Sequence, residues 1–339
     1  MNEIALSLSE NIDSIVGIAP IHEWGLTVIR AFQSVGNPVI TTLARFFTLL
    51  GDPITYLLII PVVFWCIDEK RGFKIGLTVF ISNGLNIILK EHLKILRPFY
   101  HDSSVKLAEQ SGYSTPSGHS QNSATFWPIL FAHSKNDDAT KLTLSPVSLF
   151  FALLLPILIG LSRIYLGVHY PTDVFFGWAL GAVFSLFYIL FLPRILIKLQ
   201  NVFDTIFPQR QSFRTFKLTG AAAIAFLLNA FSGTDSSMGG LVFGFAAGYI
   251  LLTEKPIDTE LPKVIFKAKE GSLIKKTARL LLGLCILAII YFGLKIILPG
   301  EGSPWYTLCR FLRYGASGFW ASLGAPRLFI LIGLSKNDQ

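Results

Sequence analysis

The chain has 339 residues, of which 52% are hydrophobic and only 15% are charged. Soluble domains carry about 25% charged residues, so this composition, with a mean hydropathy of +0.56, indicates a protein whose solvent is mostly lipid. The net charge of +8 does not indicate nucleic-acid binding, because the basic residues cluster in short segments between apolar runs. The three cysteines are widely spaced and show neither a disulfide framework nor a zinc motif.

The N-terminal region precedes the clearest apolar runs. The opening stretch MNEIALSLSENIDS is acidic and polar and lacks the basic-then-apolar pattern of a signal peptide. The segment 24–50 contains Arg30, Arg45 and the break GNP at 36–38. This pattern suits an interfacial amphipathic hairpin as well as a membrane span.

Apolar stretches that approach the ~20 residues needed to cross hydrocarbon recur along the rest of the chain. They fall at about 53–67, 75–89, 117–132, 142–162, 174–193, 218–234, 236–253, 280–294 and 314–334. Several are shorter than a full span, but flanking Lys and Arg side chains can snorkel and extend them. We therefore predict a multi-pass bundle of membrane helices.

The loops between these stretches differ in charge. The basic loops are 68–74, 133–142, 194–217 and 254–279, and the loops on the other side are 97–116, 163–173, 232–237 and 299–307. Because basic loops stay in the cytoplasm, the second set is predicted to face outward. Arg310 and Arg313 fall on the side where basic residues are otherwise scarce.

Several cations gather at the outward side. Lys90 and Arg97 are seven residues apart and share a helix face, and Arg163 ends an apolar span. A lone charge within the membrane costs roughly 3 kcal/mol, so three cations at one edge favour a strong anion between them. Arg side chains bind phosphate in a bidentate way, and the Ser117-Gly118 backbone begins a helix whose free N–H groups favour an anion. These residues predict a phosphate site.

Two imidazoles accompany these cations. His119 follows Gly118 directly, and His169 lies four residues before Asp173. A carboxylate on one ring nitrogen leaves the other as a lone pair for attack on phosphorus. His169 is therefore the predicted nucleophile, and His119 is suited to protonate the leaving alkoxide.

The three segments follow a known pattern of spacing. Lys90-x6-Arg97-Pro98, Pro116-Ser117-Gly118-His119 and Ser162-Arg163-x5-His169-x3-Asp173 together resemble the signature of the type 2 phosphatidic acid phosphatase superfamily. That superfamily includes lipid phosphate phosphatases, glucose-6-phosphatase and the vanadium haloperoxidases. The resemblance covers roughly 70–195. It implies an all-α fold and a metal-independent mechanism without a cofactor.

The resemblance also assigns roles to the residues of the signature. His169 would form a phosphohistidine, oriented by Asp173, and His119 would protonate the leaving group. The phosphoryl oxygens would be held by Lys90, Arg97, Ser117, Gly118 and Arg163.

We accordingly predict four regions. Residues 1–50 form interfacial or membrane-embedded helices, 51–198 a catalytic core, 199–217 a basic cytoplasmic linker, and 218–339 C-terminal transmembrane helices of unknown role. The location indicated by the short tails and compact layout is a bacterial inner membrane, with the site facing the periplasm or exterior. An endoplasmic-reticulum location stays open.

The predicted function is hydrolysis of a lipid phosphate monoester or diphosphate, of the phosphatidic acid, sphingoid-base phosphate or polyprenyl diphosphate type. A phosphotransferase to a hydroxyl acceptor and a phosphatase of a soluble ester stay open, as does a membrane transporter or scaffold that only binds. The expected partners are the phosphorylated lipid and membrane lipids, without nucleic acid. The sequence leaves the oligomeric state open.

Overall fold

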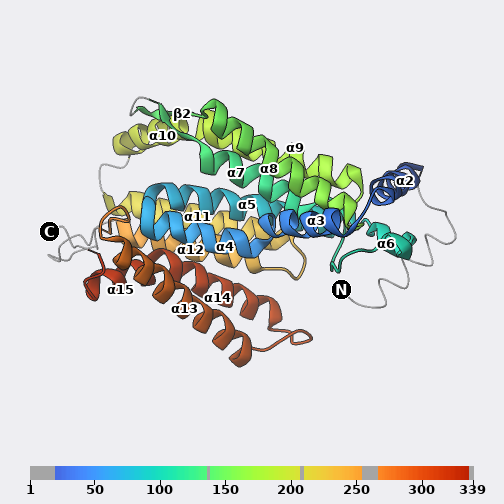
Figure 1. The fold of residues 1–339 in the computed structure, drawn as a ribbon. Helices are drawn as coiled ribbons and strands as arrows, with labels where there is room; N and C mark the ends of the chain where they lie inside the picture. The colour runs from blue at the N-terminus through green and yellow to red at the C-terminus, as the bar shows by residue number, and fades with distance from the viewer. Residues whose placement is uncertain (1–19, 136–137, 207–209, 254–265, 336–339) are drawn as a thin grey trace. The chain divides into compact units, whose positions relative to one another are not determined.

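The structure of the protein is a computed structural model that describes residues 20–135, 138–206, 210–253 and 266–335. It divides into two compact units (Figure 1). Unit 1 comprises residues 1–55 and 89–191, and unit 2 comprises residues 56–88 and 192–339. The four regions predicted from the sequence follow the order of the chain, and their boundaries stay predictions.

Unit 1 begins with two helices, α2 (Pro20–Ser34) and α3 (Pro38–Leu50). Asn37 caps α3 by accepting a hydrogen bond from the amide of Ile40. The apolar face of α2 is buried at Leu26 and Ile29 in a core cluster that also contains Leu166 and Tyr170. The segment 24–50 is thus a helix, a break and a second helix. Neither α2 nor α3 is long and apolar enough to cross a membrane by itself. Helix α3 is so only when it and Pro53–Ile67 are taken as one bent span.

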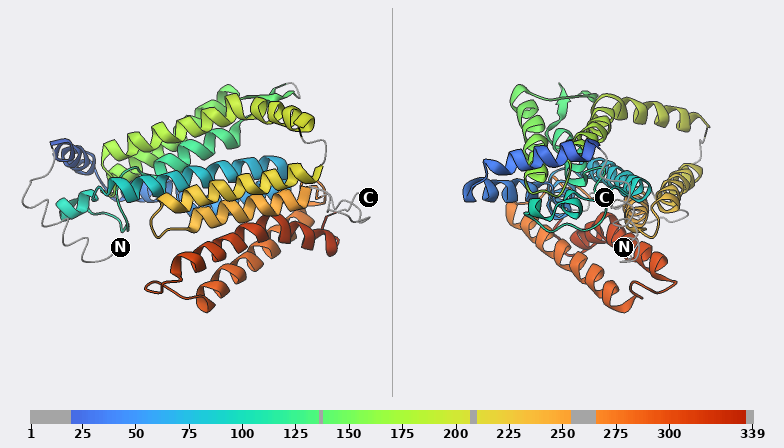
Figure 2. Two further views of the ribbon diagram at one scale, coloured as in Figure 1. Left: turned by 180° about the vertical axis from the view of Figure 1, so that it is seen from behind. Right: turned by 90° about the vertical axis from the view of Figure 1, so that its right-hand side faces the viewer.

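The centre of unit 1 is formed by α7 (Gly118–Phe131), α8 (Pro146–Tyr165) and α9 (Pro171–Leu186), which lie side by side in Figures 1 and 2. Gly177 and Gly181 let α9 approach α7 closely. A Cβ atom at Gly177 would lie 2.6 Å from the carbonyl oxygen of Ser117, and one at Gly181 would lie 2.4 Å from that of Gln121. Small residues four apart allow such contact between membrane helices. This contact places the start of α7 against the start of α9, where the predicted site residues lie.

The other elements of unit 1 are short. They are α6 (Pro98–His101), the 3₁₀ helix η2 (Ser103–Val105), strands β1 (His133–Lys135) and β2 (Asp138–Thr143), and the π-helical turn η3 (Phe187–Phe191). The two antiparallel strands pair His133 with Thr143 in part of the loop 133–142, where the sequence predicted no strand. Residues 136–137 of that loop lie outside the described residues.

Unit 2 contains the remaining helices. They are α4 (Pro53–Val62), the π-helical turn η1 (Val63–Ile67), most of α5 (Glu69–Leu93), α10 (Leu192–Ile206), α11 (Arg210–Phe231), α12 (Ser237–Thr253), α13 (Leu273–Ile297), α14 (Tyr306–Phe319), the π-helical turn η4 (Trp320–Gly324) and α15 (Ala325–Leu331). The described part of the predicted linker 199–217 is helical and belongs to α10 and α11, and residues 207–209 lie outside the described chain.

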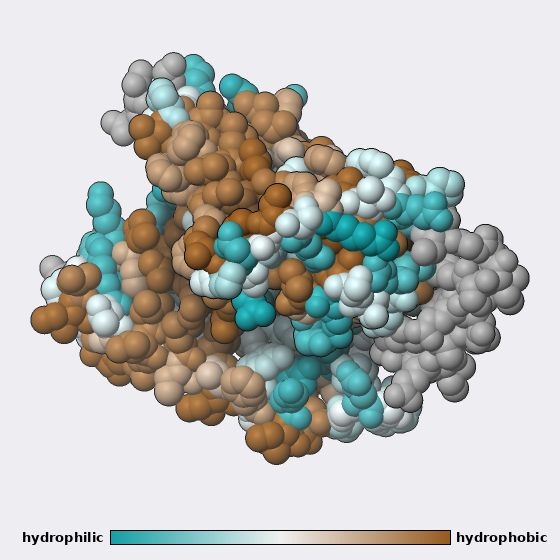
Figure 3. All heavy atoms as spheres, turned by 45° about the vertical axis from the view of Figure 1, so that its right-hand side comes forward, coloured by the Kyte–Doolittle hydropathy of each residue, from teal (hydrophilic) through white to brown (hydrophobic). Residues whose placement is uncertain are grey.

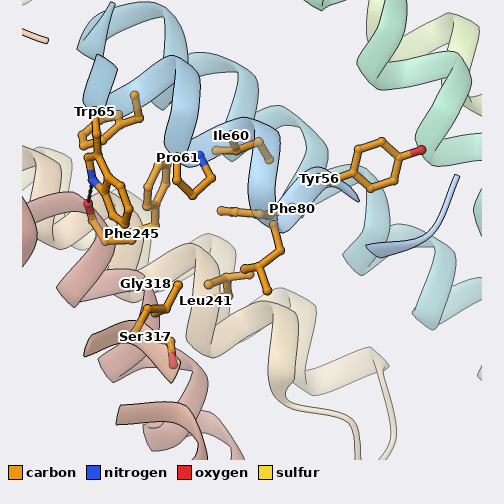
Figure 4. Close-up of a pocket in the computed structure, with 13 residues that line it drawn as sticks. Tyr56, Ile60, Pro61, Trp65, Phe80, Leu241, Phe245, Ser317 and Gly318 are labelled. Atoms are coloured by element: carbon orange, nitrogen blue, oxygen red, sulfur yellow. Dashed lines mark hydrogen bonds between the residues drawn. The ribbon is translucent and has the colours of Figure 1, made fainter. Parts of the chain in front are cut away.

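Helices α12 and α14 pack through glycines. A Cβ atom at Gly244 would lie 1.9 Å from the carbonyl oxygen of Gly315, and one at Gly240 would lie 2.3 Å from that of Phe311. Trp65 is fully buried nearby and donates from Nε1 to the carbonyl of Ala321 at 2.8 Å (Figure 4). Arg279 is also fully buried and donates to backbone carbonyls, including those of Leu334 and Ala268. Arg279 ends the predicted basic loop 254–279, and in the structure it belongs to α13. Residues 254–265 of that loop lie outside the described chain.

Each of the nine predicted apolar stretches lies largely on a helix. Among the described residues, four helices are long and apolar enough to cross a membrane, or five if the broken pair Pro38–Ile67 is one span. Large apolar side chains are exposed on these helices, as at Ile296, Val183 and Phe150. Figure 3 shows hydrophobic side chains spread over much of one face. Exposed apolar surface on this scale is stable in lipid, and the protein is a polytopic helical membrane protein.

Candidate active site

The three motif segments converge within unit 1. They are the last turn of α5 with the chain that follows it, the start of α7, and the turn between α8 and α9. Lys90, in the last turn of α5, donates from Nζ to the carbonyls of Tyr113 and Ser114 at 2.7 and 2.9 Å. These two bonds tie the end of α5 to the residues directly before the helix α7.

Arg97 links the same loop to the turn between α8 and α9. Its side chain is buried, and it donates from Nε to the carbonyl of Gly112 and from one terminal nitrogen to that of Ser111, both at 2.8 Å. The other terminal nitrogen donates to the carbonyl of Val168 at 2.8 Å and lies 3.2 Å from Nε2 of His169. The guanidinium is therefore held rigidly against one ring nitrogen of His169.

Asp173 lies on the opposite side of the His169 ring. Its Oδ2 is 3.4 Å from Nδ1 of His169 and accepts hydrogen bonds from the hydroxyl of Ser114 at 2.5 Å and the amide of Tyr170 at 2.8 Å. Its Oδ1 accepts a hydrogen bond from the hydroxyl of Thr115. The Ser114 hydroxyl also lies 3.3 Å from Nδ1 of His169. The carboxylate is thus fixed from several directions, and Ser114 bridges it to the imidazole.

These contacts determine which nitrogen of His169 carries the proton. A guanidinium can only donate hydrogen bonds, so Nε2 beside Arg97 must present its lone pair. The proton then lies on Nδ1, directed toward Ser114 and Asp173. This is the tautomer that a nucleophilic imidazole requires.

The surroundings of His169 also favour its neutral form. Burial holds the pKa of His169 well below its ordinary value of 6.5, and the positive charge of Arg97 lowers it further. The same electrostatic effect reaches His169 from Lys90, Arg163 and His119. The predicted residues therefore lie close enough together to act on one imidazole.

Arg163 is the third cation of the site. Its terminal nitrogens donate to the hydroxyl of Thr48 and, at 2.6 Å, to Oε1 of Gln110. Its Nε is buried and has no hydrogen-bond acceptor in the described part of the chain. A buried donor left without an acceptor costs about 1–3 kcal/mol, and a phosphoryl oxygen would satisfy it.

Ser117 differs from its predicted role in one respect. Its amide donates to the carbonyl of Asp173 at 3.0 Å, and its hydroxyl accepts from the amide and hydroxyl of Ser120 as the N-cap of α7. The Ser117 amide is therefore not free for an anion, because it joins α7 to α9. The first two amides of α7, those of Gly118 and His119, have no partner one turn earlier within the helix. His119 packs against Gly51, where a Cβ atom would lie 3.1 Å from its ring.

Four polar residues of the site were missed by the sequence analysis. Ser114 and Thr115 hold Asp173, and Thr48 and Gln110 hold Arg163. The position of Ser114 and Thr115 directly before Pro116-Ser117-Gly118-His119 was an available signal. Thr48 and Gln110 stand in ordinary sequence, and only the fold brings them to the arginine.

Two regions of the chain match models of known protein families. Residues 71–196 match the model of the PAP2 superfamily, and residues 236–337 match that of the PAP2 superfamily phosphatase transmembrane extension. The two matched regions together make up more than half of the chain.

Curated relatives are similar over part of their length. The chain is 35% identical to phosphatidylglycerophosphatase B of Bacillus subtilis over 29% of this chain and 46% of the relative. It is 35% identical to undecaprenyl-diphosphatase of Sulfolobus acidocaldarius over 37% of this chain and 59% of the relative. It thus spans about half the length of these relatives.

A solved structure is also similar in sequence. It is the crystal structure of a transmembrane PAP2-type phosphatidylglycerolphosphate phosphatase from Bacillus subtilis, at 25% identity over 57% of this chain and 95% of that chain. The TM-score of this comparison is 0.42.

Proposed function

The chain belongs to the PAP2 superfamily, and we propose that it is an integral membrane phosphatase that hydrolyses a lipid phosphate monoester or diphosphate without a metal ion. The single observation that carries the proposal is the arrangement of the two ring nitrogens of His169. Its Nε2 presents a lone pair to Arg97, and its Nδ1 faces Ser114 and Asp173. A neutral imidazole among three cations is arranged for attack on a phosphate.

The phosphoryl group would sit between Arg97, Lys90 and Arg163. The buried Nε of Arg163 supplies a donor for one oxygen, and bidentate Arg contacts suit the others. Three cations around one dianion also neutralise the charge that spreads over the equatorial oxygens in the transition state. This explains why a membrane protein would retain so much buried positive charge.

The proposed reaction has two steps. Nε2 of His169 forms a bond to phosphorus while the bond from phosphorus to the lipid oxygen breaks, and His119 donates its proton to that oxygen. Water then attacks the phosphohistidine, His119 takes a proton from the water, and the nitrogen–phosphorus bond breaks to release inorganic phosphate. The protein returns to its starting state with one water consumed.

The position of the site in a membrane protein and the names of its relatives support a lipid substrate. Relatives include the phosphatidylglycerophosphatase and the undecaprenyl-diphosphatase, and more distantly a probable sphingosine-1-phosphate phosphatase of Dictyostelium discoideum. Glucose-6-phosphatase 3 of Homo sapiens is also similar, at 32% identity over 44% of that protein. A soluble phosphate ester is therefore included among the substrates to be tested.

The test uses purified protein in detergent with EDTA and a panel of phosphates. The panel contains phosphatidylglycerophosphate, phosphatidic acid, a sphingoid-base phosphate, a polyprenyl diphosphate and glucose 6-phosphate, with release of inorganic phosphate as the readout. Hydrolysis that requires the lipid chain and disappears in His169→Ala supports the proposal. Equal hydrolysis of glucose 6-phosphate would favour the soluble ester. Turnover unchanged in His169→Ala would reject this nucleophile.

A second measurement separates hydrolysis from transfer. Adding a candidate alcohol and analysing the products distinguishes free phosphate from a new phosphate ester. We further propose that the site faces the periplasm or exterior of a bacterial inner membrane, because the loops that carry the motifs are poorer in basic residues than the alternate loops. A cysteine introduced at Ser103 of a variant whose three native cysteines are replaced by Ser, labelled in intact cells with a membrane-impermeant reagent, tests this orientation.

A further inference from the structure

A second group of charged and aromatic side chains lies in unit 2, where α13 and α14 pack together. It contains Arg310 and Arg313, the two arginines that the topology analysis found on the side poor in basic residues. Arg310 has a carboxylate partner. It donates from Nε and one terminal nitrogen to the two oxygens of Asp235 at 3.1 and 3.0 Å. This bidentate pair neutralises Arg310.

Arg313 has no such partner. Its guanidinium carbon lies 5.3 Å from the ring centre of Tyr291 and 5.5 Å from that of Tyr314, and the two tyrosine hydroxyls are 3.2 Å apart. Its Nε is buried without a hydrogen-bond acceptor, and no carboxylate pairs with it in the part of the chain that the structure describes. Aromatic faces attract a cation, but they supply neither a counter-charge nor acceptors for the guanidinium. The side chain is half-buried, so a ligand can reach it.

An apolar pocket begins one helical turn away. Leu287 lies four residues before Tyr291 on α13, Ser317 lies four residues after Arg313 on α14, and both line the pocket. The rest of the lining includes Leu57, Ile60, Phe245 and Ala321. Figure 4 shows side chains from several helices around it. Its cavity volume is about 50 Å³, which is enough for a short part of one hydrocarbon chain.

We propose that unit 2 binds an anionic phospholipid, with the phosphate on Arg313 and part of one acyl chain along the pocket. A guanidinium without a carboxylate partner can take a phosphate diester as its counter-charge, because the phosphate oxygens accept two parallel hydrogen bonds from it. The rings of Tyr291 and Tyr314 lie against the guanidinium, and the half-buried side chain leaves part of it accessible. The adjoining apolar lining then distinguishes a lipid phosphate from a free one. This site is separate from the residues proposed for catalysis, and it does not depend on their function.

Native mass spectrometry of the full-length protein in detergent tests the site. The probes are dioleoyl phosphatidylglycerol, dioleoylglycerol with the same chains and no phosphate, and inorganic phosphate. We expect the wild type to retain phosphatidylglycerol and neither of the other two. Arg313→Gln should lower the bound fraction at least fivefold. Lys269→Gln, which removes an exposed positive charge elsewhere in unit 2, should leave it unchanged.

Three results would overturn the proposal. The first is that Arg313→Gln retains as much phospholipid as the wild type, and the second is that Lys269→Gln loses as much as Arg313→Gln. The third is that the wild type binds dioleoylglycerol as well as phosphatidylglycerol. If Arg313→Gln does not fold, as judged by thermal melting, Arg313→Lys replaces it. That variant keeps the charge but loses the bidentate contact, so we expect at least a twofold loss, and unchanged retention contradicts the site. Leu287→Trp, which fills the pocket, should lower retention while Arg313 is intact, and normal retention would remove the acyl chain from the proposal.

Discussion

A terminal nitrogen of Arg97 lies 3.2 Å from Nε2 of His169 and at the same time donates to the carbonyl of Val168, the residue before the histidine. The arginine therefore positions both the ring and the backbone that carries it. Because it can only donate, it also requires that the lone pair of the imidazole point toward the cations. The guanidinium that would bind the phosphoryl oxygens thus also orients the imidazole that would attack phosphorus.

The first prediction concerns the acid limb of the pH–rate profile. His169 attacks only when neutral, and its lowered pKa means that the neutral form persists as pH falls below 6.5. The value of kcat/KM, which reports the free enzyme, should therefore decline only at more acidic pH. In Arg97→Gln the lost positive charge lets the pKa rise, so the limb should move to higher pH. The shift should be partial, because burial is the larger cause.

Arg97→Lys is the matched control for this measurement. It retains the positive charge, so the acid limb of the pH–rate profile should stay at the same pH as in the wild type, although the rate itself should be lower. Titration of the free substrate's phosphate enters kcat/KM equally for all three proteins and cancels in the comparison. A limb at the same pH in Arg97→Gln and the wild type would show that Arg97 does not tune the imidazole.

The second prediction concerns Ser114, which bridges Asp173 and His169. Ser114→Ala removes the bridge and leaves the nucleophile, so kcat should fall about tenfold to a hundredfold, as for other partners that orient a functional imidazole. KM should change little because the cations are intact. Ser123→Ala removes a buried hydroxyl that donates only to the carbonyl of Ser120, and it should retain the wild-type kcat. Equal losses in the two variants would contradict a positioning role.

The third prediction separates binding from chemistry through Gln110. Its Oε1 accepts a hydrogen bond from Arg163 at 2.6 Å, and hydrogen bonds to charged groups contribute about 1.5–3 kcal/mol. Gln110→Ala should raise KM about tenfold with a smaller change in kcat, because Arg163 loses its fixed orientation. The control is Glu109→Ala, in which an exposed neighbour that pairs with Lys106 is removed. A KM unchanged in Gln110→Ala would mean that Thr48 alone is sufficient to hold Arg163.

The fourth prediction concerns the turn that carries His169. Gly167 has a φ of 67°, and a Cβ atom there would lie 1.9 Å from the carbonyl oxygen of Val105. Gly167→Ala should therefore destabilise the fold by more than the 1–2 kcal/mol that a left-handed conformation costs roughly, and it should lower activity together with the melting temperature. Gly112 has a φ of 74° with nothing within 4 Å of an added Cβ. Gly112→Ala should therefore lower the free energy of unfolding only by the cost of the left-handed conformation. Similar melting temperatures for the two variants would show that the turn adapts around the new methyl group.

Much of the fold was predictable because the apolar stretches are long. Each of the nine stretches lies largely on a helix, since a chain in lipid must satisfy its backbone groups within the segment. The strands His133–Lys135 and Asp138–Thr143 were not predicted, because this short polar loop shows no alternating apolar pattern. The expectation that the Ser117 amide is free was wrong, because that amide donates to the carbonyl of Asp173, while a role of Ser117 in binding the phosphoryl group stays a prediction.

The sequence by itself determined the membrane character of the protein and the identity of the residues with unusual chemistry. Charge and imidazole are costly in an apolar chain, so Lys90, Arg97, His119, Arg163 and His169 stood out at fixed spacing. The tertiary structure alone decided which ring nitrogen of His169 holds the proton and that Thr48 and Gln110 orient Arg163. It also decided that Arg310 pairs with a carboxylate while Arg313 has none among the residues that the structure describes. These relationships join residues far apart in the chain through hydrogen bonds, and spacing along a sequence carries no information about the direction of such bonds.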